Sequence, residues 1–264
     1  MALMFAFHLT AGDGPVLISL PHVGLSVPDD LLPDLTPAAQ TLPDTDFQVE
    51  ALYDFAPRLD CSVLRAVHSR YVVDLNRPPD DAALYETPTS GLVPRLTFAG
   101  EAIYRPGFEP DAAEVARRLA RYWQPYHQAL AATLERLRRR HGHAVLLDAH
   151  SIRSHVPRLF AGRLPDLNLG TFDRQSAAPA LIDVAWQALG SDLRFSRVCD
   201  GRFRGGYITR HYGDPAYGVH AVQLELAQAC YMDEEHPQRV DPVAQAPLKV
   251  VLERLVEALS AWRP

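Results

Sequence analysis

Two histidines follow short apolar runs that are typical of buried strands. His22 comes two residues after the run Val16–Leu20, and the run Ala144–Leu147 leads directly into Asp148 and His150. Ligands and catalytic groups gather at the carboxyl ends of strands in open α/β sheets. Each histidine is therefore well placed to bind a metal ion or to transfer a proton. For His22 taken alone, a turn histidine that only bonds a carbonyl group is an equally good interpretation.

Asp148 and His150 are two residues apart, so in an extended strand both side chains point to the same side. Asp148 could then orient a histidine through its second ring nitrogen, a common role for carboxylates around metal sites. Two histidines and one carboxylate leave a position open for water on Zn²⁺, which is the layout of a hydrolytic site. We therefore expect a divalent metal ion, with zinc as first choice, held by His22, His150 and an acid.

The acidic ligand is expected near the start of a helix predicted over Thr45–Leu59. The candidates are Asp44, Asp46 and Glu50. Asp46 and Glu50 are four residues apart and would share one face of that helix. The same acids could instead cap the helix or complement its dipole. We select Asp46 as the ligand, with Asp44 and Glu50 as alternatives.

A carboxylate-binding pair is predicted directly after a third apolar run. Tyr71–Leu75 has the composition of a strand, and Asn76 and Arg77 follow it before two prolines. Arginine can bind a carboxylate through two parallel hydrogen bonds, and asparagine can add a donor. Arg77 could instead pair with a nearby aspartate and stabilise the loop, but the Asn–Arg pair at the start of a loop favours ligand binding.

A glycine-rich segment contributes two further candidates, Tyr207 and Arg210, beside the adjacent glycines 205 and 206. Glycine permits the backbone to approach a bound molecule closely. We interpret Tyr207 as a candidate catalytic residue and Arg210 as a candidate substrate-binding residue.

Glu225 lies inside the apolar run Ala221–Leu226, where an unpaired carboxylate would be costly. Near a metal ion it could act as the general base towards water, with Gln223 facing the same way. An edge strand with a solvated polar side is the rival interpretation.

Ser151 is a candidate substrate-binding residue. It lacks the Gly-x-Ser-x-Gly elbow of serine hydrolases, so a role as nucleophile is only a weaker alternative. Nucleotide chemistry has no support, since no Gly-x-Gly-x-x-Gly or P-loop motif occurs.

The composition limits the partners. A net charge of −6 argues against nucleic acid or an anionic membrane as the main partner. No stretch approaches ~18 consecutive apolar residues, so no membrane span is expected. The N-terminus lacks the features of a signal peptide, and three scattered cysteines indicate reduced thiols in a cytoplasmic protein without thiolate metal ligands. We expect a small-molecule substrate, while the oligomeric state has no readable signal.

Strand-like runs alternate with helical patterns, which predicts a three-layer αβα sandwich around a mixed, mostly parallel sheet. Residues 1–264 are expected to form a single domain with long active-site loops near 76–110 and 153–174. The predicted strands are Val16–Leu20, Ser62–Ala66, Tyr71–Leu75, Ala144–Leu147 and Ala221–Leu226. The predicted helices are Thr45–Leu59, Asp111–His141 with a kink at Pro125, Ala177–Leu189 and Pro247–Trp262.

Five short motifs, in this order, resemble those of the N-formylglutamate amidohydrolase family, over about residues 15 to 230. They are Pro21-His22-Val23-Gly24, Asp74-Leu75-Asn76-Arg77, Asp148-Ala149-His150-Ser151, Gly205-Gly206-Tyr207-Ile208-Thr209-Arg210 and Gln223-Leu224-Glu225. The resemblance implies hydrolysis of N-formyl-L-glutamate to formate and L-glutamate, the last step of one route of histidine degradation. A hydrolase of another N-acyl amino acid or peptide, or a non-catalytic protein that binds acidic amino acids, is the alternative.

That family is in turn distantly similar to the zinc carboxypeptidases, with a phosphorylase/hydrolase-like fold. The similarity implies that His22 and His150 are metal ligands, Asn76 and Arg77 the carboxylate clamp, and Glu225 the base. Tyr207 matches the tyrosine of that pattern only loosely. The carboxypeptidases also carry a glutamate ligand three residues after the first histidine, where this chain has Leu25. The acidic ligand must therefore come from elsewhere in the sequence.

Overall fold

The computed structural model describes residues 6–84 and 90–264. The strands in these residues are β1 (Phe7–Thr10), β2 (Val16–Leu20), β3 (Ser62–Ala66), β4 (Ala144–Ile152), β5 (Leu167–Gly170), β6 (Arg197–Cys199) and β7 (Val219–Ala227). The α-helices are α1 (Pro37–Gln40), α2 (Val49–Leu52), α3 (Ala112–Arg118), α4 (Gln124–His141), α5 (Pro179–Leu189), α6 (Tyr207–Tyr212) and α7 (Pro242–Ala261).

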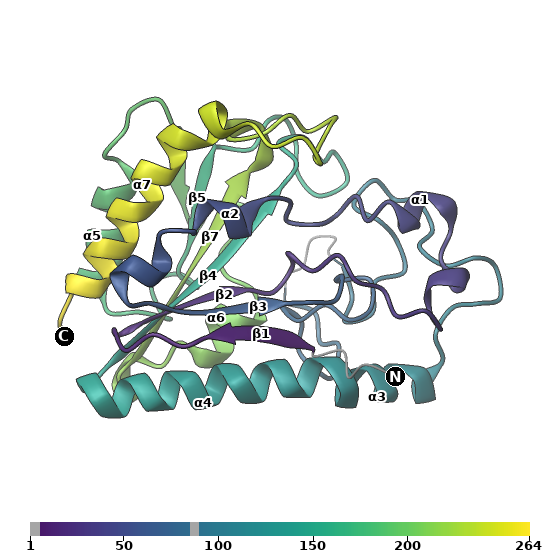
Figure 1. Ribbon diagram of the computed structural model, residues 1–264, viewed down its shortest axis with the longest axis horizontal. Coiled ribbons are helices and arrows are strands. Elements are labelled where there is room, and N and C mark those ends of the chain that lie inside the picture. Colours follow the sequence, from purple (N-terminus) through teal and green to yellow (C-terminus); the bar gives the residue numbers. More distant parts are fainter. Residues whose placement is uncertain (1–5, 85–89) are drawn as a thin grey trace.

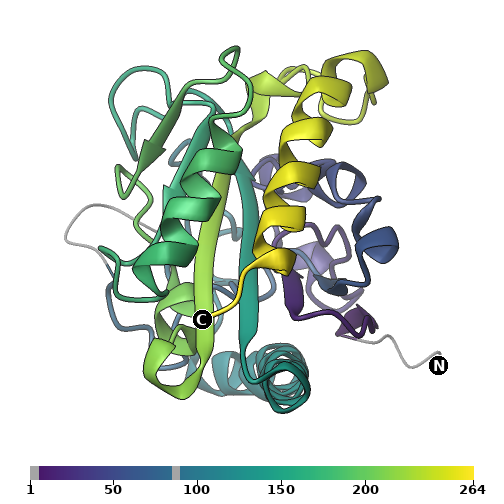
Figure 2. The same cartoon turned by 90° about the vertical axis from the view of Figure 1, so that its left-hand side faces the viewer.

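The described strands form one seven-stranded sheet in the order β1-β3-β2-β4-β7-β5-β6. The central pairs β3–β2, β2–β4 and β4–β7 are parallel, as is β5–β6, whereas β1–β3 and β5–β7 are antiparallel. Helix α4 runs along one side of the sheet, and α5 and α7 lie on the other (Figure 1). Seen from the side, α5 and α7 run next to each other, and α4 is viewed end-on (Figure 2). The predicted three-layer sandwich with a mixed, mostly parallel sheet is confirmed.

The alternation of side chains along β2 divides the core into two layers. Val16, Ile18 and Leu20 belong to the cluster that packs under α5 and α7, whereas Leu17 belongs to the cluster under α4. Ser19 shares the α4 side and hydrogen-bonds to the Tyr126 hydroxyl of that helix at 3.0 Å. β2 is buried on both faces, which explains why the run Val16–Leu20 is almost continuously apolar.

Two predicted elements are wrong. Tyr71–Leu75 is buried but forms turns, and the amide of Asp74 bonds to the carbonyl of Leu92 instead of to a neighbouring strand. The predicted helix Thr45–Leu59 is reduced to α2 and a 3₁₀ turn, because Gln48 has a left-handed backbone with φ of 61° immediately before α2. Asp46 therefore lies before the helix, where its amide bonds to the His22 carbonyl at 3.1 Å.

The long helical segment is interrupted close to Pro125, as predicted. A π-helical turn at Leu119–Trp123 separates α3 from α4, and Pro125 stands in the first turn of α4, where its missing N–H costs least. The helix ends at His141, and the following Gly142 has the left-handed φ of 78° typical of that position.

Two long loops approach the carboxyl ends of β2 and β4 (Figure 1). Residues 76–84 and 90–110 contain no helix or strand, and the remaining part of that predicted loop, 85–89, lies outside the described residues. The second predicted loop, 153–174, is shorter than expected because it includes the short strand β5. No helix within the described ranges combines the length and apolar character needed to cross a membrane.

Candidate active site

The parallel strands β4 and β7 place the central polar side chains side by side. In their register His150 is opposite Glu225, and Asp148 is opposite Gln223. The residues between them, such as Leu224, belong to the core under α5 and α7. All four polar side chains therefore project from the opposite face of the sheet, as the spacing of two predicts.

Three buried groups come together at this edge of the sheet. His22, in the turn after β2, brings its Nδ1 to 3.1 Å from Nδ1 of His150. Asp46 Oδ2 lies 3.1 Å from Nδ1 of His150 and 3.8 Å from Nδ1 of His22. Ligands bound at about 2.0–2.1 Å around a tetrahedral Zn²⁺ lie roughly 3.3 Å from one another. The three atoms therefore have the donor types and spacing of a metal site, which the selection of His22, Asp46 and His150 anticipated.

Two further carboxylates hold the ring orientations of the histidines. Asp74 Oδ1 lies 2.7 Å from Nε2 of His22, and Asp148 Oδ2 lies 3.0 Å from Nε2 of His150. With the proton on Nε2, each ring would donate to its carboxylate and present the lone pair of Nδ1 to the shared site. Nε2 of His150 also lies 2.9 Å from Nδ2 of Asn76. The predicted orienting contact of Asp148 is present. The matching role of Asp74 was missed, although Asp74 also ends a buried apolar run.

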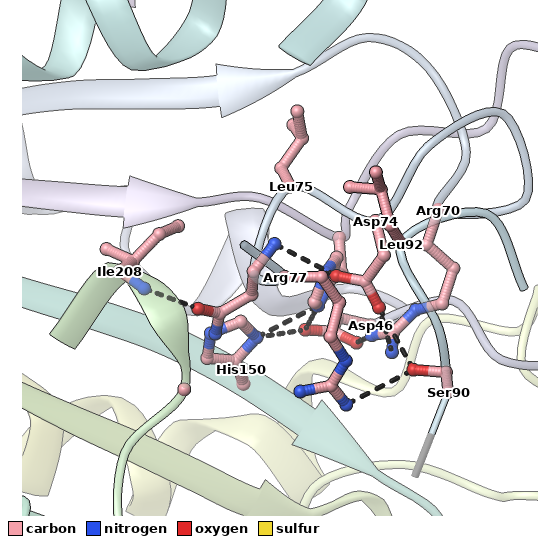
Figure 3. Close-up of polar contacts among 12 residues, drawn as sticks. Asp46, Arg70, Asp74, Leu75, Arg77, Ser90, Leu92, His150 and Ile208 are labelled. Carbon is pink, nitrogen blue, oxygen red and sulfur yellow. Dashed lines mark hydrogen bonds and ion pairs between the residues drawn. The ribbon is translucent and has the colours of Figure 1, made fainter. Parts of the chain in front are cut away.

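Arg70 is the main site residue that the sequence analysis missed. Its Nη2 donates to Asp46 Oδ1 at 2.7 Å, and its Nη1 lies 3.9 Å from Asp74 Oδ2 (Figure 3). Its guanidinium Cζ stands 4.9 Å from the centroid of the Phe98 ring. Arg70 thus connects the candidate ligand Asp46 to the carboxylate that orients His22. No local pattern marks it, because its partners are distant in sequence.

Replacing Arg70 by Met is expected to destabilise the protein by about 3–5 kcal/mol, because two buried carboxylates lose their cation. Urea unfolding of metal-free protein measures this change. Arg58→Met is the matched control, since Arg58 pairs with Glu253 at the surface and its loss is expected to change stability by less than about 1 kcal/mol. Equal effects of the two substitutions would contradict the role given to Arg70.

The protonation equilibria reflect this burial and the surrounding charges. Burial lowers the pKa of His22, and the neighbouring Arg70 lowers it further. Burial alone would also lower the pKa of His150, but Asp148 and Asp46 raise it well above its usual value. Burial opposes ionisation of Asp46, yet Arg70 and the histidines keep its pKa below the ordinary range. The aspartate is therefore ionised and available as a ligand.

The alternative acids have other partners. Asp44 accepts hydrogen bonds from the Tyr71 hydroxyl at 2.6 Å and from the Phe98 amide at 2.8 Å. Glu50 forms an ion pair with Arg65 and is exposed. Neither belongs to the group of candidate metal ligands in the described residues.

Glu225 is buried at 7% exposure and lines a cavity beside His150. Burial, together with the charges of Asp46 and Asp148, raises the pKa of Glu225 to about 8, against the opposing effects of His150 and Arg70. A carboxyl group with a raised pKa in a cleft is a typical proton carrier. The interpretation of β7 as a solvated edge strand is wrong, since β7 is paired on both sides and fully buried.

The two members of the predicted carboxylate clamp differ in their surroundings. Asn76 donates from Nδ2 to Asp148 Oδ2 at 3.0 Å and accepts from the Ile208 amide at 2.8 Å. A Cβ at Gly206 would stand 2.5 Å from Nδ2 of Asn76, so a side chain there would displace Asn76 from its hydrogen bonds. Arg77 instead extends towards Ser90, to which its Nη2 donates at 3.2 Å (Figure 3). Arg77 therefore remains the stronger candidate for binding substrate.

The same cavity contains residues from several distant segments. Ser151, predicted as a substrate-binding residue, also lines it and accepts a hydrogen bond from Gln228 Nε2 at 3.2 Å. The described lining is His22, Arg70, Asp74, Asn76, Arg77, Ser90, Phe98, His150, Ser151, Ile152, Leu159, Arg202, Phe203, Gly206, Gln223 and Glu225.

Tyr207 and Arg210 lie outside this lining. The ring of Tyr207 stacks on His211 at a centroid distance of 4.8 Å and packs near Trp123. Arg210 donates to the carbonyl groups of Gly205 and Leu84, at 2.8 and 3.0 Å. Their positions support a structural role for both side chains and give no support to the roles predicted for them.

Because the Tyr207 side chain lies outside the described lining of the cavity, Tyr207→Phe is expected to keep kcat within about threefold of the parent protein. A threefold change corresponds to ~0.7 kcal/mol in the activation free energy. Steady-state kinetics of the purified variant provide the measurement. A loss of 100-fold or more would show that the phenol acts in the reaction and would restore the role inferred from sequence.

Comparisons with known proteins agree with this architecture. The family model for N-formylglutamate amidohydrolase matches residues 14–232. An N-formylglutamate deformylase of Pseudomonas putida is 48% identical over 259 residues, which cover 98% of this chain and 96% of the relative. A protein of the same name from Pseudomonas aeruginosa is 51% identical over 253 residues, or 95% and 94% of the two chains.

A solved structure is similar over nearly the whole chain. The crystal structure of N-formylglutamate amidohydrolase from Ralstonia eutropha JMP134 has a TM-score of 0.82 at 25% identity, covering 97% of this chain and 98% of that chain. The length of the match to the family model and the near-complete coverage of the curated relatives lead to one conclusion. This chain belongs to the N-formylglutamate amidohydrolase family.

Proposed function

We propose that the protein hydrolyses N-formyl-L-glutamate to formate and L-glutamate, the reaction that the names of its relatives indicate. The observation that carries the proposal is the buried group His22, Asp46 and His150 beside Glu225, in a cavity that Arg77 also lines. These residues provide a candidate metal site, a proton carrier and a cation for a substrate carboxylate, which together suit hydrolysis of an N-acyl amino acid. The reaction would complete one route of histidine degradation.

We further propose a divalent metal ion at this group, with zinc as the first choice. Two imidazole nitrogens and one carboxylate oxygen are donors that Zn²⁺ accepts, and their spacing fits tetrahedral coordination. The balance of buried charge supports a cation here. Three carboxylates around the group, namely Asp46, Asp74 and Asp148, are buried, and the buried Arg70 contacts two of them, Asp46 and Asp74. A divalent ion would compensate part of this excess negative charge.

A bound divalent ion would supply polarisation of the formyl oxygen and would favour ionisation of a water molecule. The positive charge of that ion would lower the raised pKa of Glu225, so that its carboxylate takes the proton of the attacking water and then delivers it to the leaving nitrogen of the amide. Asp74 and Asp148 keep the two imidazole rings in the orientation that leaves Nδ1 unprotonated. Arg77 binds a substrate carboxylate, and this positioning can contribute several kcal/mol to catalysis.

Formate release tests the proposal. Purified protein supplied with Zn²⁺ is incubated with N-formyl-L-glutamate, N-acetyl-L-glutamate or N-succinyl-L-glutamate, and the released acid is quantified. The proposal predicts turnover of the formyl compound, with much slower reaction of the larger acyl groups. Preference for another acyl group would leave the hydrolytic site in place and replace the substrate. Binding of L-glutamate without any turnover would identify a binding protein instead of an enzyme.

A further inference from the structure

We propose that Trp123 and His127 are positioning residues that hold the segment 75–77 in the shape that binds a substrate carboxylate. This inference rests on the proposed function, because it takes Arg77 as the residue that receives that carboxylate. Asn76 and Arg77 line the cavity, whereas its described lining includes neither Trp123 nor His127. Both rings would therefore act through the backbone that carries Arg77, without touching the substrate.

The segment 75–77 lies in turns and belongs to none of the described strands, so no ladder satisfies its carbonyl groups. A buried carbonyl group without a donor is costly. Each of the three carbonyl groups instead accepts a hydrogen bond from another part of the chain. The donors are Nε2 of His127 to Leu75 at 2.9 Å, the Tyr207 amide to Asn76 at 3.3 Å, and the indole Nε1 of Trp123 to Arg77 at 3.0 Å. Two of the three donors are thus side chains of one helical segment.

The π-helical turn Leu119–Trp123 lies where this helical segment meets the turns of 75–77. Such a turn contains an extra residue, which rotates the side chains after it by about 100° relative to an uninterrupted α-helix. Trp123 is its last residue, and His127 follows four positions later on the same face. The two rings stack at a centroid distance of 3.7 Å and an interplanar angle of 24°. Turns of this kind are frequent at functional sites, and this one directs two donors to one short segment.

His127 is also held from its other side, by α6. Burial lowers the pKa of His127 to about 3, so its ring is neutral near pH 7. Because a carbonyl oxygen only accepts, Nε2 of the neutral ring carries the proton, and Nδ1 accepts from the Tyr212 hydroxyl at 3.0 Å. Trp123 and His127 are both buried, at 8% and 5% exposure. The two donors to the segment are therefore themselves fixed by packing.

The side chain of Arg77 points from this fixed backbone towards Ser90 (Figure 3). A substrate carboxylate would meet an arginine whose main chain is already in its binding conformation. Preorganisation of this kind lowers the entropy lost on binding. Loosening the backbone should consequently weaken substrate binding more than it slows the chemical step.

A double-mutant cycle in the zinc-supplied protein tests whether Trp123 acts through Arg77. Trp123→Phe removes the indole donor and keeps an aromatic ring against His127. KM for N-formyl-L-glutamate is expected to rise roughly 3- to 10-fold, the effect of one lost hydrogen bond, while kcat stays within about threefold. The dissociation constant for L-glutamate, measured by calorimetry, should rise by the same factor. In Arg77→Met protein, adding Trp123→Phe should change neither constant by more than about twofold.

Trp186→Phe is the matched control, because Trp186 lies on α5 and packs against Arg197. It should leave both constants unchanged. His127→Phe removes the donor to the Leu75 carbonyl and is expected to raise both constants as Trp123→Phe does. If Trp123→Phe does not fold, His127→Phe takes its place in the cycle.

A folded Trp123→Phe protein with unchanged constants and only a lower urea midpoint would overturn the inference, since Trp123 would then only stabilise the fold. Equal effects of Trp123→Phe with and without Arg77 would also overturn it. If the parent protein binds L-glutamate but releases no formate, the proposed function fails, and the glutamate constants still decide this inference. If it neither binds L-glutamate nor releases formate, both fail.

Discussion

Replacing Glu225 by Gln is expected to lower kcat for formate release by about 10²–10⁴-fold, the range typical of a lost general base. Glutamine has nearly the same shape, so the packing of β7 is preserved while the proton carrier is removed. Glu225 is not part of the candidate ligand group, and the metal content of the variant should therefore equal that of the parent protein. Kinetics of formate release and elemental analysis on one preparation measure both quantities.

Glu253→Gln is the matched control for this substitution. Glu253 lies on α7 and pairs at the surface with Arg58, so the same chemical change there should leave kcat unaffected. An active Glu225→Gln protein would show that another group carries the proton. An inactive variant that has also lost its metal would show that Glu225 contributes to metal binding and would require a different base.

The second large effect is expected for Asp46→Asn. The substitution removes the candidate anionic ligand between the two histidines and the closest carboxylate partner of Arg70. Changes in residues that only orient ligands commonly weaken metal binding 10- to 100-fold, so loss of a ligand should cost at least about 100-fold. Competition with a chelating zinc indicator measures the dissociation constant, and kcat should fall in parallel at limiting zinc.

Asp44→Asn and Glu50→Gln separate this assignment from the alternatives that the sequence left open. Asp44 is held by Tyr71 and Phe98, and Glu50 by Arg65, so neither change should shift zinc affinity by more than a few-fold. Zinc affinity that depends on Asp44 or Glu50 and not on Asp46 would show that the site rearranges when the ion binds. That result would contradict the ligand group described above.

The elements whose sequence signal is local could be predicted well. The bounds of β2 and β3 match the predicted runs. β2 is buried at every position and almost continuously apolar, whereas β3 alternates buried and half-buried positions. Asp148 and His150 are two residues apart, as are Gln223 and Glu225, and this spacing correctly predicts that each pair shares one face of its strand. His22 and His150 follow from the same logic, since each comes at or just after the end of such a strand.

The remaining contacts depend on packing between distant segments. Tyr71–Leu75 is as apolar as a strand, but a carbonyl of the loop at Leu92 takes up the Asp74 amide that a ladder would have used. The place of Arg70 in the site depends on its hydrogen bond to Asp46, which lies 24 residues away in sequence. The Tyr207 ring packs against the rings of His211 and Trp123, and this packing sets its orientation. Residue types and spacing within a motif do not contain this information.

The central claim is that His22, Asp46 and His150 hold a divalent ion on which formate release depends. The most direct measurement is the metal content of the purified protein together with its rate of formate release from N-formyl-L-glutamate, before and after chelation. About one equivalent of bound metal per chain is expected, with loss of activity when the metal is removed and recovery when zinc is added back. Full activity in the chelated, metal-free protein would contradict it.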